Sequence, residues 1–123
     1  MKLHDARLAI AGLLEDTLNL TPGRTLFAGR FPPGVRTGVT FAFTGIRRWN
    51  PDAAMECEAE IHGISASEEE LSEILAALRE LLQSDHASGV LAWQLAGPVK
   101  LSVLPGVPAD RYEFVMPLAV SFV

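Results

Sequence analysis

The 123-residue chain contains one cysteine, Cys57, which excludes an internal disulfide and a cysteine-based metal site. It has no apolar run near the roughly 18 residues that a membrane-spanning helix requires, so we expect no membrane partner. It also lacks GxxxxGK[ST], GxGxxG, GxSxG and HExxH, the motifs of phosphate, dinucleotide, nucleophile and zinc sites. These absences favour a protein that is not an enzyme and that needs no cofactor or metal.

Acidic residues are absent from one long stretch of the chain, between Thr17 and Pro51. The charged residues of that stretch are five arginines: Arg24, Arg30, Arg36, Arg47 and Arg48. The next stretch, from Asp52 to Asp85, carries ten acidic residues and one basic residue, Arg79. The net charge of −5 therefore hides a division into a basic segment followed by an acidic one.

The basic segment has three interpretations. The first is a solvated basic loop. The second is a subunit interface, because arginine is enriched at interfaces and lysine is depleted there, and the chain has eight arginines but two lysines. The third is nucleic-acid binding, which an isoelectric point near 5.1 disfavours, so we expect no sequence-specific nucleic-acid partner.

The interface interpretation predicts two complementary surfaces on neighbouring copies of the chain. Its basic side comprises Arg24, Arg30, Arg36, Arg47, Arg48 and Trp49. Its acidic side comprises Glu56, Glu58, Glu60, Glu68 and Glu69. A contact between two different surfaces is heterologous, so it closes into a ring or continues as a filament.

Hydrophobic periodicity predicts two helices. Apolar residues at helical spacing run from Leu3 to Leu18, and Thr21, Pro22 and Gly23 follow as a stop signal. Ser67 and Glu70 form a capping box that begins a second amphipathic helix, which we expect to end near Gln83.

Strand patterns occupy the rest of the chain. We expect strands within 25–31, 39–43, 55–62, 90–95, 99–104 and 111–123, with a loop over 46–54 and a turn over 105–110. In the 55–62 strand, alternation predicts one face toward the core and one toward solvent. The core face comprises Met55, Cys57, Ala59 and Ile61, and the solvent face comprises Glu56, Glu58, Glu60 and His62. We interpret all three histidines, His4, His62 and His86, as solvated surface residues.

The order of these elements indicates a single α+β domain over residues 1–123. We predict an antiparallel, possibly mixed, sheet of four to six strands packed against two helices, in the order α-β-β-β-α-β-β. Both helices are expected on one face of the sheet, because this arrangement buries every apolar stripe.

This layout resembles the tail-terminator and minor capsid, or head-tail joining, proteins of long-tailed bacteriophages. The resemblance is carried by the N-terminal helix and by TLFAGRFPP, MECEAEIHG, SEEELSEILAALRELL and PVKLSVLPGVPADRYEFVMPLAVSFV. In the last segment a turn leads Arg111 into a long alternating strand.

The resemblance implies a structural virion subunit that forms a homohexameric ring, ends the tail tube and joins it to the head. Its implied partners are further copies of itself, the tail-tube protein and the head connector protein. Its implied location is the virion tail, after synthesis in the bacterial cytoplasm. The alternative is a small soluble ligand-binding or enzymatic α+β domain, with a site around Arg47, Trp49 and His62.

Overall fold

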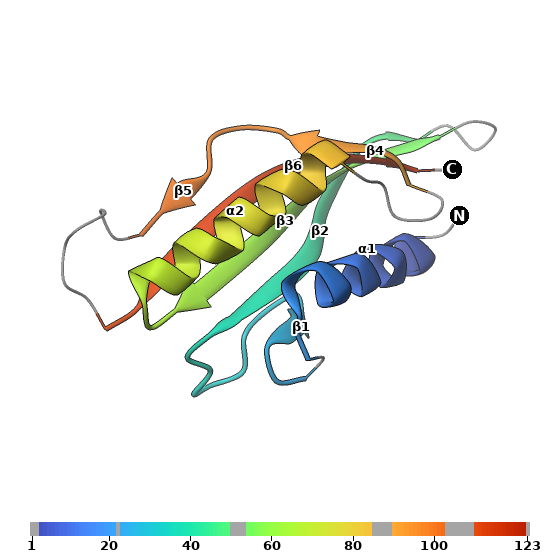
Figure 1. Cartoon of the computed structure of the whole chain (residues 1–123). Coiled ribbons are helices and arrows are strands. Elements are labelled where there is room, and N and C mark those ends of the chain that lie inside the picture. The colour runs from blue at the N-terminus through green and yellow to red at the C-terminus, as the bar shows by residue number, and fades with distance from the viewer. Residues whose placement is uncertain (1–2, 22, 50–53, 85–89, 103–109, 123) are drawn as a thin grey trace.

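The computed structural model describes residues 3–21, 23–49, 54–84, 90–102 and 110–122. Two helices form one layer and a six-stranded sheet forms the other, with both helices on the same face (Figure 1). This arrangement confirms the predicted α+β class, although three strands follow α2 and the predicted order had two. The elements are α1 (Leu3–Leu18), β1 (Leu26–Ala28), β2 (Gly38–Trp49), β3 (Met55–Ser65), α2 (Glu68–Ser84), β4 (Val90–Leu95), β5 (Lys100–Leu101) and β6 (Tyr112–Phe122).

The sheet is mixed and has β3 and β6 at its centre. Its strand order is β1-β2-β3-β6-β4, and β5 also pairs with β6. The short pairing of β1 with β2 is parallel and the other pairings are antiparallel. The register of β3 with β6 runs without a shift over eleven residues of each strand, from Met55↔Phe122 to Ser65↔Tyr112.

The apolar core lies between the helices and the central strands. β3 and β6 supply buried residues at every second position, as the alternation predicted. Neither helix in the described part of the chain has the length and apolar character needed to cross a membrane. The helices supply Ala6, Ile10 and Leu14 from α1 and Leu71, Leu78 and Leu81 from α2.

The beginning of α2 is capped almost as predicted. The Glu70 amide donates to the Ser67 hydroxyl at 3.3 Å, which satisfies one of the free amides of the first turn. The Ser67 amide donates to the Ser65 hydroxyl at 3.1 Å, and that hydroxyl donates to the Glu70 carboxylate at 3.3 Å. Ser65, which is fully buried, therefore completes the capping box by linking the glutamate to the Ser67 amide.

The predicted end of β2 is wrong. We expected a strand within 39–43 and a loop over 46–54, but β2 continues to Trp49. Its register with β3 shifts at two irregularities between Phe43 and Arg48. A bulge adds a residue to one strand and interrupts the alternation of its side chains. The alternating pattern in the sequence therefore ends before the strand does.

Other strand ends differ less. β1 and β5 are shorter than the predicted 25–31 and 99–104 strands, and β6 begins one residue after Arg111. Most of the turn predicted at 105–110 lies outside the described residues, as does His86.

Gly63 in β3 has no side chain and so leaves room for an aromatic ring from β6 to lie over it. It pairs with Phe114, and a Cβ atom at this position would lie closer than 3.0 Å to three carbons of the Phe114 ring. Phe114 is fully buried, so its ring has little room to move. The absence of a side chain at Gly63 is therefore a packing requirement.

Gly63→Ala is expected to lower the free energy of unfolding by about 1–3 kcal/mol, the usual cost of overpacking a core. Gly12→Ala in α1 is the matched control, because a Cβ there meets no atom within 4 Å and alanine favours a helix by up to about 1 kcal/mol. Urea unfolding of both variants measures the difference. Equal stabilities would contradict the packing requirement.

Candidate subunit interface

The face of the sheet opposite the helices, called here the open face, carries the predicted acidic ladder of β3. Glu58 and Glu60 are exposed there and Glu56 is half-buried. Along the ladder, Glu60 lies between Ala42 of β2 and Pro117 of β6. Successive carboxylates are about 7 Å apart along a strand, so the ladder presents separate charges.

Arg47 lies against this ladder within its own chain. Its guanidinium is 3.9 Å from the Glu56 carboxylate and 3.8 Å from the Glu58 carboxylate. The neighbouring Arg48 is opposite Glu56 in the strand register and makes no ion pair with any described residue. Some of the charges that we predicted to pair between two copies of the chain therefore pair within one subunit.

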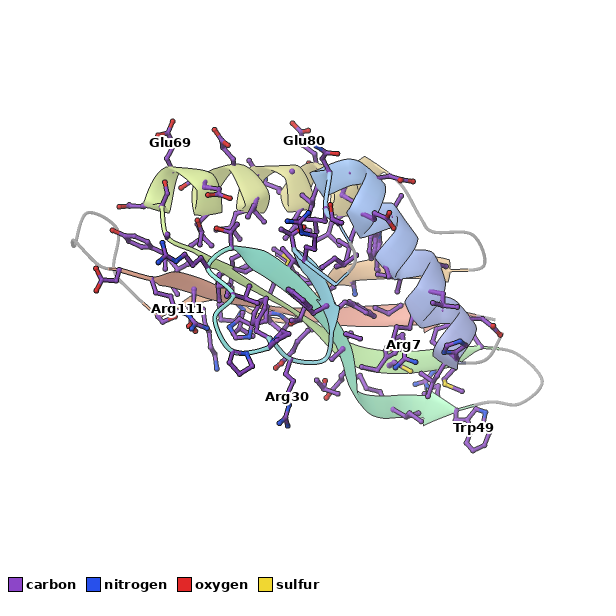
Figure 2. All side chains as sticks on the ribbon, turned by 90° about the horizontal axis from the view of Figure 1, so that it is seen from below. Arg7, Arg30, Trp49, Glu69, Glu80 and Arg111 are labelled. Carbon is purple, nitrogen blue, oxygen red and sulfur yellow. The ribbon has the colours of Figure 1, made fainter. Side chains whose placement is uncertain are left out.

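The other arginines of the predicted basic side lie apart from that pair. Arg24 is exposed in the turn after α1, and Arg30 and Arg36 are exposed on the segment between β1 and β2. Arg36 shares a small polar pocket with Arg111. Figure 2 shows Arg30 pointing away from the sheet on the side opposite α2.

The remaining acidic residues lie on the helix side of the molecule. Glu69 is exposed and Glu68 is half-buried in the first turn of α2. Figure 2 shows Glu69 and Glu80 pointing outward from α2, on the side opposite Arg30. The residues of the predicted acidic side therefore lie on two separate surfaces, one on β3 and one on α2. Only the α2 surface lies across the molecule from the arginines.

Trp49 is the most exposed large apolar side chain among the described residues, with 68% of its surface accessible. It projects from the end of β2 (Figure 2). β1 pairs with β2 only at 39–41, so no strand in the described part of the chain pairs with this edge of β2 from Ala42 to Trp49. An exposed aromatic beside a free strand edge is typical of a protein contact.

The interpretation of His62 as a solvated surface residue holds only in part. Its side chain is 33% exposed, and its Nε2 lies 3.4 Å from a carboxylate oxygen of Glu113. Its ring also meets the edge of Phe31 with centroids 5.2 Å apart. Glu113 pairs in turn with Arg111. Sequence periodicity missed this cluster because β6 brings Glu113 next to β3 from 51 residues away. His4 is exposed, as predicted.

The ligand-binding alternative required Arg47, Trp49 and His62 to converge, and the structure keeps them apart. Arg47 lies beside Glu58, whereas His62 is four residues further along β3, which is about 13 Å. Cys57 is fully buried, and burial raises the pKa of its thiol, so the reactive thiolate is disfavoured. Within the described ranges, no three His, Cys, Asp or Glu side chains are grouped to hold a metal ion.

An apolar groove between α2 and strands β4 and β5 was not foreseen. Its volume is about 500 Å³, and Leu95 and Leu101 on its floor are 49% and 46% exposed. The sequence showed that α2 has a wide apolar stripe. It gave no signal that one flank of the stripe, at Leu75 and Leu82, stays only partly covered.

No protein-family model matches the chain, and a search of curated proteins finds no significant match.

The Arg47 ion pairs are expected to contribute little to folding, because half of the arginine side chain is exposed and such pairs are worth about 0–1 kcal/mol. Arg47→Ala should lower the free energy of unfolding by less than about 1 kcal/mol in urea titrations. A loss above about 2 kcal/mol would show that the pair holds the β2–β3 hairpin together.

Proposed function

We propose that the chain is a structural, non-enzymatic virion protein of a long-tailed phage or prophage. In this proposal it forms a ring, with six copies as the expected number, that ends the tail tube and joins it to the head. Its partners are then its own copies, the tail-tube protein and the head connector protein.

The observation that carries the proposal is the layout of the fold. Two helices cover one face of a mixed sheet, and the chain ends in an eleven-residue strand, β6, at the sheet centre. This is the layout on which the resemblance to tail-terminator and head-tail joining proteins rests. The resemblance supports the class of protein, and the surfaces support assembly.

The charges support a contact between unlike surfaces. Arg30 and Arg48 are exposed and have no ion-pair partner among the described residues, and the outward face of α2 carries Glu69, Glu73 and Glu80. Exposed ion pairs contribute at most about 1 kcal/mol each. Charge can therefore orient neighbouring subunits and speed their encounter, but a stable ring also needs an apolar contact.

The alternative, a ligand-binding or enzymatic domain, loses the site that suggested it, because Arg47 and Trp49 lie far from His62. The cluster is held on the open face by the His62–Glu113 hydrogen bond and the Glu113–Arg111 ion pair. We therefore retain the structural protein as the proposed function.

Reversing free charges on the basic side should weaken assembly. We expect Arg30→Glu with Arg36→Glu to shift the full-length chain toward monomers, measured by size-exclusion chromatography with light scattering at low and high salt. Adding Glu69→Lys with Glu73→Lys in a second chain should restore association when the two variants are mixed. An unchanged association constant in the first variant would contradict the charged contact.

Deletion of the gene tests the proposed function directly. In a phage or inducible prophage that encodes this chain, its loss should give headless tails of irregular length in electron micrographs, and expression in trans should restore joined particles. Flanking capsid and tail-tube genes are expected. Normal particles after deletion would contradict the function while leaving self-association open.

A further inference from the structure

The groove between α2 and the edge formed by β4 and β5 has the size and lining of a small-molecule site. Its volume is about 500 Å³, and such sites usually measure roughly 300–1,000 Å³. Its polar lining residues are Arg79, Gln83 and Gln94. The apolar ones are Leu75, Leu82, Trp93, Leu95, Val99, Leu101 and Met116. A mainly apolar cleft with a few polar groups fits an amphipathic ligand.

The groove is long and deep. The register of β4 and β5 with β6 sets Leu95 and Leu101 four residues apart, which is about 13 Å along the sheet. Trp93 and Met116 also line the groove, although each is only 3% exposed. A partner helix, about 10–12 Å across, would rest on the exposed leucines and stop short of Trp93 and Met116. An unbranched hydrocarbon chain is slender enough to reach them.

Arg79 is the one charged residue among the described residues that line the groove. It is the only basic residue of α2, it is exposed, and it makes no ion pair with any described residue. Glu80, the next residue along the helix, points outward (Figure 2). The residues three and four positions from Arg79 carry no charge, and they are Leu75, Ala76, Leu82 and Gln83. The groove therefore offers a free cation beside an apolar surface.

This charge selects among ligands. A neutral hydrocarbon would bury apolar surface but leave Arg79 without a partner, and a cationic amphiphile would be repelled. A carboxylate accepts hydrogen bonds from the guanidinium and also from the Gln83 amide, one helical turn away. An apolar chain that ends in a carboxylate therefore matches both parts of the lining.

We propose that the groove binds a free long-chain carboxylic acid. Its carboxylate lies at Arg79 and Gln83, and its hydrocarbon chain lies against Trp93, Met116 and the exposed leucines. This site goes beyond the proposed virion role and does not rest on it. No lining residue belongs to the charged surfaces proposed for assembly, so the two can be tested separately.

Isothermal titration calorimetry of the full-length chain with laurate, a saturated unbranched carboxylate, tests the site below the micelle concentration. Laurate should bind with one-to-one stoichiometry. Each methylene added between octanoate and laurate should tighten binding by up to about fourfold, the effect of burying one CH₂ group. Dodecyltrimethylammonium, which has the same chain length and the opposite charge, should bind more weakly.

Arg79→Glu tests the charge, and the variant should fold because Arg79 is exposed. It should weaken laurate binding by at least about threefold, the size expected for a partly exposed ion pair. It should also prefer dodecyltrimethylammonium to laurate. Arg48→Glu is the matched control, since it reverses another exposed arginine outside the groove and should keep the wild-type preference. An unchanged preference in Arg79→Glu would contradict the position of the carboxylate.

Leu95→Asp tests the apolar lining and should weaken the binding of both amphiphiles by at least about tenfold, because it places a charge against the hydrocarbon chain. Leu8→Asp is the matched control, since Leu8 is a similarly exposed leucine on α1 outside the groove, and it should bind laurate like the wild type. Trp49→Phe leaves Trp93 as the only tryptophan, so laurate should change its emission. Circular dichroism checks that every variant is folded.

Several results would overturn the proposal. They are wild-type protein that shows no saturable laurate binding, binding that Leu95→Asp leaves unchanged, and binding without a change in Trp93 emission. Co-sedimentation with phosphatidylglycerol vesicles that Leu95→Asp abolishes would assign the groove to a membrane surface instead. A wild-type dimer that excludes laurate and dissociates in Leu95→Asp would assign it to a second copy. The gene deletion tests only the virion role, so normal particles after deletion would leave a positive laurate result intact.

Discussion

The packing of both helices against one face of the sheet, with α2 over β3 and β6 and α1 over β2, is the constraint on which the rest of this structure depends. Once the apolar sides of α1 and α2 cover the same face, the other face carries the glutamates of β3 beside Val115, Pro117 and Ala119 of β6. Beyond Phe41, β2 has no described strand on its outer side, and β4 has none either. The charged ladder, the free edge of β2 and the groove beside β4 all follow from this one-sided packing.

Periodicity predicted the parts of the fold that repeat locally. Both helices, the alternation of β3 and β6 and the cap at Ser67 could be predicted because each depends on residues a few positions apart. The end of β2 could not, since its bulges are visible only in the register with β3. The close approach at Gly63 and the His62–Glu113 contact also join distant segments, which no local pattern reveals.

The predicted interface residues were selected by charge, and charge alone does not specify position. The pairing of β2 with β3 places Arg47 beside Glu56 and Glu58, so opposite charges close in sequence became internal partners. Folding placed the α2 acids on the other side of the molecule. The groove escaped prediction for a different reason, because a leucine on a helix flank looks the same in sequence whether or not another element covers it.

The sheet of the subunit has two unlike ends as well as two unlike edges. The end of β2 and the start of β3 lie at one end of the sheet, and the segment between β1 and β2 lies at the other (Figure 1). Subunits that close into a ring through unlike surfaces must all point the same way. An assembly made in this manner has a built-in polarity, so its two rims can meet two different neighbours.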